Sequence, residues 1–201
     1  MSKADRTRAA LRDVALRHYV ERGFEAASVP AIAAEVGVTE RTFYRHFATK
    51  DEVLFGDVVD RLAWFATALR ERPDEEDLVR SVLGALGSAP TDPQLLTEIA
   101  RLRTELLSAE RIERTYRDRQ GAMATELRAV LIERGATQLD AAVRAEVVAG
   151  AVFAALAVWT EGAGPHDVRR LGDLTRQALE RVRPARQRVL GKACDAEGAA
   201  G

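Results

Sequence analysis

Between Thr39 and Lys50 the chain carries side chains that can hydrogen-bond to a polyanion and to the flat edges of nucleobases. The guanidinium of Arg41 can donate two parallel hydrogen bonds, which matches the O6 and N7 acceptors of guanine in the DNA major groove. The side chains of Thr39 and Thr42 can add a hydroxyl hydrogen bond or a methyl contact with thymine. Thr39, Arg41 and Thr42 are therefore the predicted base-contacting residues.

A second group of polar side chains suits contacts with the DNA backbone, which set the register of a protein without reading sequence. Phosphate oxygens accept hydrogen bonds from hydroxyl, imidazole, guanidinium and ammonium groups. Glu40 opposes such contacts, so its carboxylate either accepts from cytosine N4 or turns away. The predicted phosphate-contacting residues are Ser28, Tyr44, Arg45, His46 and Lys50.

A turn between two helices is needed to place these side chains on an exposed helix face. Gly37 can end one helix in the left-handed conformation, and Thr39 can cap the next helix through its side-chain oxygen. Phe43 and Phe47 are four residues apart, so they share a face that a three-helix domain must bury. Residues 36–50 therefore predict a helix-turn-helix with a polar face left exposed.

Apolar spacing along the rest of the chain predicts an all-α fold of about nine helices without a strand. A Thr49-x-x-Glu52 capping box is expected to open the fourth helix, which Pro73 closes. Residues 88–93 form the clearest linker. The other helices are predicted over residues 5–22, from Ser28, from Thr39, over 78–86, 95–106, 112 to about 135, 139–161 and 167–183.

The predicted domain organisation follows from these segments. Residues 1–50 form an N-terminal three-helix unit with the helix-turn-helix, and residues 51–188 form a larger helical domain. Residues 189–201 are rich in Gly, Ala and charge, so they are expected to be a disordered tail. The chain has a formal net charge of −1, yet residues 1–50 hold nine Lys or Arg against six Asp or Glu. The excess of Lys and Arg over Asp and Glu therefore lies in the same region as the predicted helix-turn-helix.

Composition also argues against several other classes of protein. Cys194 is the single cysteine, so no internal disulfide or cysteine-based metal site forms, and a reducing cytoplasm is the expected location. The N-terminus lacks the apolar segment of a signal peptide. The apolar run Val147–Trp159 has 13 residues, below the roughly 18 to 20 that span a bilayer, so no membrane segment is expected.

The chain shows no sequence pattern of catalysis. It has no glycine-rich phosphate loop after a strand and no His-x-x-x-His pair. The acidic run at residues 74–77 lies where a helix begins, and there it favours the helix dipole. We therefore expect no enzyme activity, no cofactor and no metal.

In order and spacing, about fifty residues of the N-terminal region resemble the TetR family of transcriptional regulators. The resemblance implies an all-helical homodimer of nine or ten helices per chain, whose C-terminal domain binds a small effector that changes the distance between two DNA readers. It also implies that Thr39, Arg41 and Thr42 face the bases. The matching residues are Leu11, Ala15, Tyr19, Gly23, Phe24, Ser28, Val29, Ile32, Ala33, Gly37, Val38, Thr39, Thr42, Phe43, Tyr44, Arg45, His46, Phe47 and Lys50.

By the same resemblance, residues 139–183 are expected to form a four-helix dimer interface, and the small residues between Ala149 and Ala157 favour close helix approach. The implied function is a cytoplasmic repressor that releases a two-fold-related operator on binding a small molecule. A similarity to acyl-CoA-binding members makes an acyl-thioester one candidate effector. Bulky residues proposed to surround the effector pocket are Trp64, Phe65, Tyr116, Met123 and Phe153.

Two other interpretations of the sequence remain open. A non-enzymatic helical adaptor that binds protein would show no salt-sensitive affinity for DNA. A DNA-binding regulator without an effector would bind its own site in a salt-sensitive way, but no small molecule would release it.

Overall fold

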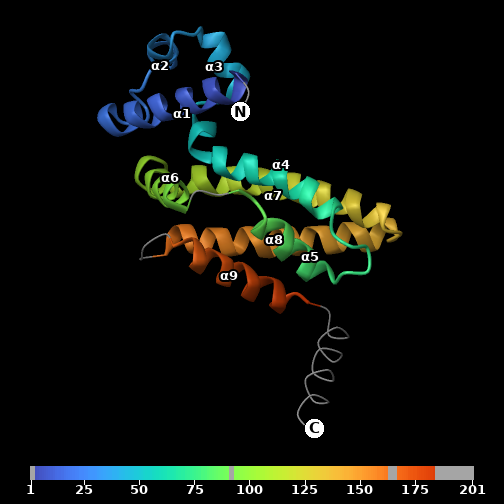
Figure 1. Cartoon of the computed structure of the whole chain (residues 1–201). Coiled ribbons are helices and arrows are strands. Elements are labelled where there is room, and N and C mark those ends of the chain that lie inside the picture. The colour runs from blue at the N-terminus through green and yellow to red at the C-terminus, as the bar shows by residue number, and fades with distance from the viewer. Residues whose placement is uncertain (1–2, 91–92, 163–166, 184–201) are drawn as a thin grey trace, which may run out of the picture. The chain divides into compact units, whose positions relative to one another are not determined.

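The computed structural model describes residues 3–90, 93–162 and 167–183, and every regular element in these ranges is a helix (Figure 1). The all-α class predicted from the sequence is confirmed for this part of the chain. The predicted tail, which includes Cys194, lies outside the described residues. The elements are α1 (Lys3–Arg22), α2 (Val29–Val36), α3 (Glu40–His46), the 3-10 helix η1 (Asp51–Phe55), α4 (Gly56–Arg70), α5 (Leu78–Gly87), α6 (Pro93–Leu106), α7 (Ala109–Glu133), α8 (Gln138–Glu161) and α9 (Val168–Arg181).

The described residues pack as two compact units. The first lies within Met1–Arg61 and Thr91–Thr115, and the second within Leu62–Pro90 and Tyr116–Gly201. Unit 1 therefore contains α1 to α3, η1 and α6, while α4 and α7 contribute residues to both units. These units describe packing, so the functional boundary placed after residue 50 stays a prediction.

The core of unit 1 is closed by the inner faces of α1, α2 and α3. Leu11, Ile32 and Phe43 are fully buried, and Phe47 is nearly so. Gly37 ends α2 with φ 75°, the left-handed conformation in which its N–H contacts a carbonyl of the last turn. Both the buried face and the glycine turn agree with the sequence prediction.

The entry to the fourth helix differs from the sequence prediction. The Thr49-x-x-Glu52 capping box does not form; instead a carboxylate oxygen of Glu52 accepts from the Ala48 N–H, and a 3-10 turn precedes α4. Three consecutive apolar residues of this turn, Val53 to Phe55, are fully buried. Because α1 and α6 both pack against η1, burial from two sides outweighs the local capping signal.

A buried arginine ties α6 to this turn. Arg103 is fully buried, and its Nε and Nη2 donate to the carbonyl oxygen of Leu54 at 2.9 and 2.7 Å. Its guanidinium also lies over the ring of Phe55, 4.7 Å from the centroid. The last turn before α4 is therefore held by a charge-assisted contact from a helix about 50 residues away in sequence.

In unit 2, α8 and α9 lie side by side (Figure 1). The indole N–H of Trp159 donates to the carbonyl oxygen of Asp167 at the start of α9, 2.9 Å away. The hydroxyl groups of Tyr116 and Thr160 lie 2.9 Å apart between α7 and α8. These contacts satisfy the polar atoms of side chains that are otherwise buried in apolar surroundings.

Among the described helices, α8 is long and apolar enough to cross a membrane by length and composition. The same test is passed by core helices of soluble proteins, and 39% of the tested window is buried inside the structure. Ala141, Ala145 and Ala149 form part of this buried face. The composition of α8 is therefore weak evidence for a membrane span.

We predict that Arg103→Met lowers the free energy of unfolding by about 1 to 3 kcal/mol, because the buried Leu54 carbonyl loses a charged donor. The matched control is Arg101→Met on the same helix, which removes only exposed ion pairs with Glu98 and Glu105 and costs about 0 to 1 kcal/mol. Urea unfolding followed by circular dichroism compares the two variants. Equal losses would show that the Leu54 contact contributes nothing beyond a surface pair.

Candidate nucleic-acid interface

Two of the three predicted base-contacting residues meet at the start of α3. Thr39 is the N-cap residue, and its Oγ1 accepts from the Thr42 N–H at 3.2 Å. The two hydroxyl oxygens are 3.0 Å apart, so one donates to the other. Thr39 is exposed and Thr42 is half-buried. The cap predicted from the sequence is present, and it leaves both threonine side chains at the accessible end of the helix.

Arg41 projects from the first turn of α3 and is exposed. Within the ranges that the structure describes, no carboxylate or carbonyl pairs with its guanidinium. The neighbouring Glu40 is also exposed and supplies a negative charge at the helix N-terminus. Arg41 therefore keeps its donors available for an external acceptor.

The exposed side of α3 continues with Tyr44 and Arg45. Tyr44 has 46% of its surface exposed, and its ring packs edge-on against Phe43, with the centroids 5.5 Å apart. Arg45 is exposed. Ser28 is the exposed N-cap residue of α2, and its hydroxyl makes no capping bond. All three side chains have polar atoms in positions that a phosphate can reach.

His46 lies on the inner side of the same helix. It is half-buried, and its Nε2 is buried without a hydrogen-bond partner among the described residues. Burial, followed by the charges of Arg45 and Arg8, lowers the pKa of His46 from its usual value. The imidazole is therefore neutral at neutral pH, and Nε2 has to be uncovered before it can meet a phosphate. Its predicted phosphate contact stays a prediction.

Lys50 makes contacts that its place in the sequence motif did not indicate. Its ammonium donates to the carbonyl oxygen of Phe24, to that of Glu25 at 3.2 Å and to that of Ala27 at 3.1 Å. It also lies 4.5 Å from the centroid of the Phe24 ring. A phosphate contact by Lys50 would replace some of these bonds, and that contact also stays a prediction.

Arg111, at the start of α7, is a residue of this unit that the sequence did not single out. Its guanidinium pairs with both oxygens of Asp51, the Nη2 contact being 2.8 Å, and with Glu25 at 2.9 Å. It also lies over the Phe24 ring, 4.8 Å from the centroid. No motif could have revealed this contact, because the partners are 60 and 86 residues away in sequence.

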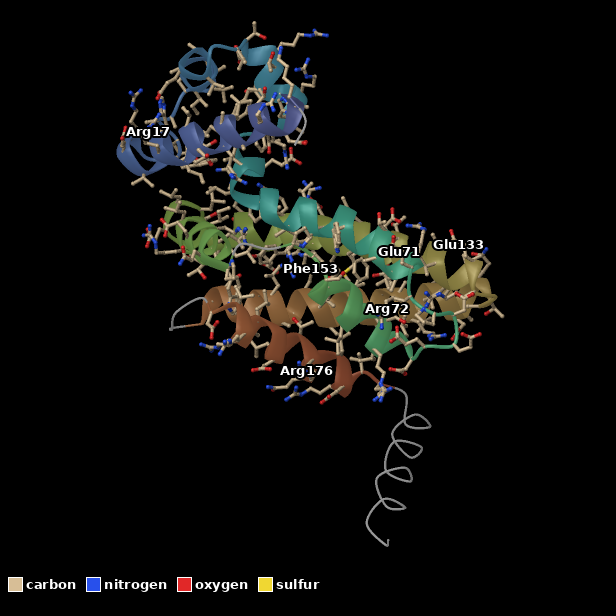
Figure 2. All side chains as sticks on the ribbon, in the orientation of Figure 1. Arg17, Glu71, Arg72, Glu133, Phe153 and Arg176 are labelled. Atoms are coloured by element: carbon tan, nitrogen blue, oxygen red, sulfur yellow. The ribbon has the colours of Figure 1, made fainter. Side chains whose placement is uncertain are left out.

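The predicted effector-pocket residues do not share one environment. Phe65 and Met123 are buried, and Tyr116 and Phe153 meet edge-on in the interior of unit 2, with centroids 6.1 Å apart. Figure 2 labels Phe153 among the helices of unit 2. Trp64 is 43% exposed and donates from its indole to Ser88 Oγ at 3.0 Å. Four of these residues therefore lie in the core, while Trp64 lies at the surface; their role in ligand binding stays a prediction.

Unit 2 also contains a cavity of about 250 Å³, which none of the predicted effector-pocket residues lines. The walls of this cavity are largely charged. It is lined by Asp74, Glu76, Leu78, Leu131, Arg134, Gly135, Ala136, Asp140 and Arg144. Several of these charges already pair within the protein: Arg134 contacts Asp74, and Arg144 contacts Asp140. Among the described residues no group of His, Cys, Asp or Glu is arranged to hold a metal ion.

Comparison with known proteins finds a match for the segment that contains α2, α3 and most of α1. Residues 11–55 match the family model described as bacterial regulatory proteins, tetR family. Residues 11–55 therefore form a TetR-family N-terminal region. The matched segment contains the glycine turn and the whole of α3, so the TetR-family region coincides with the surface formed by Thr39, Arg41 and Tyr44.

A curated relative of this TetR-family protein is the HTH-type transcriptional regulator TcmR of Streptomyces glaucescens, which is 39% identical over 83 residues. The match covers 41% of this chain and 37% of TcmR. Among solved structures, a transcriptional regulator from Rhodococcus sp. Rha1 aligns with 90% of this chain and 96% of its own, at 24% identity and a TM-score of 0.47. The TetR-family regulator PfmR of Thermus thermophilus aligns with 85% of this chain and 94% of its own, at 21% identity and a TM-score of 0.40.

We predict that Thr39→Ala lowers the free energy of unfolding by about 1 kcal/mol, because the Thr42 N–H loses its acceptor at the start of α3. Thr39→Ser is the matched control, since serine keeps the capping oxygen and removes only the methyl group. Urea unfolding of the three proteins provides the measurement. A loss in the serine variant as large as that in the alanine variant would assign the effect to methyl packing.

Proposed function

We propose that this TetR-family protein is a cytoplasmic transcriptional repressor that binds a two-fold-related DNA operator as a homodimer and is released by a small molecule. The observation that carries the proposal is the exposed guanidinium of Arg41, which no described residue pairs, beside Thr39 and Thr42 on α3. A short helix whose outer face carries an arginine and hydroxyl groups matches the donor and acceptor pattern of the major groove.

In the proposed complex α3 lies in the major groove. Arg41 donates to a guanine, while Thr39 and Thr42 contact the neighbouring bases. Tyr44 and Arg45 reach the flanking phosphates, and Ser28 offers its hydroxyl at the start of α2, where helix N–H groups also favour an anion. Sequence preference therefore depends on the first turn of α3, and general affinity depends on the surrounding cationic and hydroxyl groups.

The outer face of α8 supports the proposed homodimer. Leu139, Val143, Val147 and Val158 are exposed apolar residues. At about 100° per residue they fall within one stripe about 100° wide, which Gly150 and Ala154 continue. A wide apolar stripe with small residues at its centre allows a second helix to approach closely. In a symmetric dimer the same stripe from a second copy covers it.

The interior of unit 2 supports an effector that is mostly apolar with a polar group. Tyr116 and Thr160 form a buried hydroxyl pair, and Phe153 packs against the Tyr116 ring. Ligand sites commonly combine apolar walls with a few polar groups. An acyl-thioester meets this description. Binding releases DNA only to the extent that the effector prefers the conformation in which the two readers have the wrong spacing.

Salt dependence separates this proposal from a protein-binding adaptor. A specific reader loses affinity for DNA steeply as salt rises and still prefers its own site, whereas an adaptor shows neither property. A regulator without an effector also binds DNA in a salt-sensitive way and prefers its own site, but it stays bound to DNA in the presence of candidate metabolites. Binding to a duplex enriched from a random-sequence pool, repeated across salt concentrations and with acyl-thioesters, decides among the three.

We predict that Arg41→Ala relaxes preference at a single position of the enriched site, costing about 1 to 3 kcal/mol against the preferred base. Arg45→Ala is the matched control on the same helix face; it weakens binding to all duplexes alike and reduces the slope of log K against log salt by about 1. Fluorescence anisotropy with single-base variants of the site provides both readouts. Equal, sequence-independent losses in both variants would remove Arg41 from base reading.

We also predict that Val147→Glu converts the dimer to monomer, because a charge in the apolar stripe of α8 is desolvated on association. Val20→Glu is the control, since Val20 is a comparably exposed apolar residue on α1 and lies outside the stripe. Sedimentation velocity gives the mass of each variant. A Val147 variant that stays dimeric at micromolar concentration would place the interface elsewhere.

A further inference from the structure

The ammonium of Lys50 has a complete set of internal partners. An ammonium has three N–H donors, and three carbonyl oxygens of the α1–α2 turn, those of Phe24, Glu25 and Ala27, lie within hydrogen-bond reach of it. The ring of Phe24 covers a further side at 4.5 Å. Lys50 therefore binds the turn through its charge, and none of its donors remains for an outside acceptor.

The backbone of Lys50 is held by the same part of the structure. The hydroxyl of Tyr19 donates to the Lys50 carbonyl at 2.9 Å, and the Tyr19 ring packs edge-on against Phe24 with centroids 5.1 Å apart. Tyr19 is fully buried. The side chain of Lys50 thus holds the α1–α2 turn, while its main chain is held by the last turn of α1. The contacts of Lys50 therefore connect the end of α1 and the α1–α2 turn to the residue that precedes η1.

A phosphate near Lys50 would also meet negative charge. Asp51 and Glu25 lie next to Lys50 and its carbonyl partner in sequence, and both carboxylates contact Arg111. Lys50 and Arg111 each lie over the Phe24 ring, so two cations and two carboxylates balance around one aromatic side chain. This balanced cluster offers little net attraction for a polyanion.

The turn held by Lys50 leads directly to the start of α2. Ala27 accepts from Lys50 and precedes Ser28, the N-cap residue of α2. The Ser28 hydroxyl and the helix N-terminus are the proposed phosphate contacts of this helix. A shift of this turn by a fraction of the hydrogen-bond length would misplace them, because hydrogen bonds weaken steeply with poor geometry.

We propose that Lys50 is a positioning residue: its ammonium fixes the carbonyls of Phe24, Glu25 and Ala27, and so places the N-terminus of α2 on the DNA backbone, without contacting a phosphate itself. The proposal rests on the proposed DNA-binding function and replaces the phosphate contact predicted for Lys50 from the sequence. It assigns the phosphate contacts to Ser28, Tyr44 and Arg45.

The test compares Lys50→Met and Arg45→Met in binding to a mixed-sequence DNA duplex over a range of salt concentrations. Lys50→Met should lower affinity by about tenfold at every salt concentration, the size of one lost charge-assisted contact, with an unchanged salt slope. Arg45→Met should reduce the slope by about 1, because a phosphate contact releases counterions. Circular dichroism at the assay temperature establishes that each variant is folded.

Hydrogen exchange supplies a readout that a phosphate contact would not move. In the free protein, Lys50→Met should speed amide exchange across residues 24–36, and Lys50→Arg should restore much of the protection, since a guanidinium can also donate to carbonyls and stack on Phe24. Tyr19→Phe keeps the Lys50 charge and removes the hydrogen bond from the Tyr19 hydroxyl to the Lys50 carbonyl. It should lower DNA affinity several-fold without changing the salt slope, which keeps the test valid if Lys50→Met fails to fold.

The outcomes are distinguishable. A slope reduced by about 1 in Lys50→Met with unchanged exchange would make Lys50 a phosphate contact and overturn this inference alone. Unchanged affinity in both Lys50→Met and Tyr19→Phe would also overturn it. A wild-type protein that binds no duplex even at low salt would overturn the proposed function itself, and this inference with it.

Discussion

The burial of one face of α3 decides what the opposite face can do. Phe43 must lie in the core, and successive residues advance by about 100° around the helix. Arg41 and Arg45 therefore lie about 160° from Phe43, on the outer side, and both are exposed. His46 lies only about 60° from Phe43, which explains why its imidazole is half-buried and its Nε2 is covered. The same packing that stabilises the three-helix unit thus selects which cations can meet DNA.

Charge in this unit is divided between internal and external roles. Lys50 binds carbonyls, Arg103 binds the buried Leu54 carbonyl, and Arg111 binds two carboxylates, so all three act as structural cations. Arg41 and Arg45 project from the surface. Lys50 is one of the nine basic residues in the first fifty positions, so a count of those residues overstates the charge available to a polyanion. What matters for DNA is the position of each available donor, since phosphate contacts act over distances comparable to the Debye length or less.

The sequence predicted the features that depend on neighbouring residues. The glycine turn at Gly37, the cap at Thr39 and the starts of α2 and α3 follow from local backbone preferences, and the structure contains all of them. Contacts set by the tertiary fold were missed: the 3-10 turn is imposed by packing from two other helices, and the partners of Lys50 are about 25 residues away. Trp64 shows the same limit, because apolar size predicts burial but not which face of α4 the unit covers.

The apolar composition of α8 is compatible with both a membrane span and a helix that packs against a second copy, and the burial of its residues bears on the choice between them. Its apolar composition passes a length test for a membrane span, but Arg144 and Glu146 lie in its first half and are expensive in hydrocarbon. Its two faces differ: Ala145 is buried in its own unit, while Val143 and Val147 are exposed. One apolar face of α8 is therefore covered within its own unit and the other is exposed, and in the proposed dimer a second copy covers that exposed face by symmetry. In the proposed dimer, α8 then holds the two chains together, so a change in its packing alters the spacing of two identical readers at once.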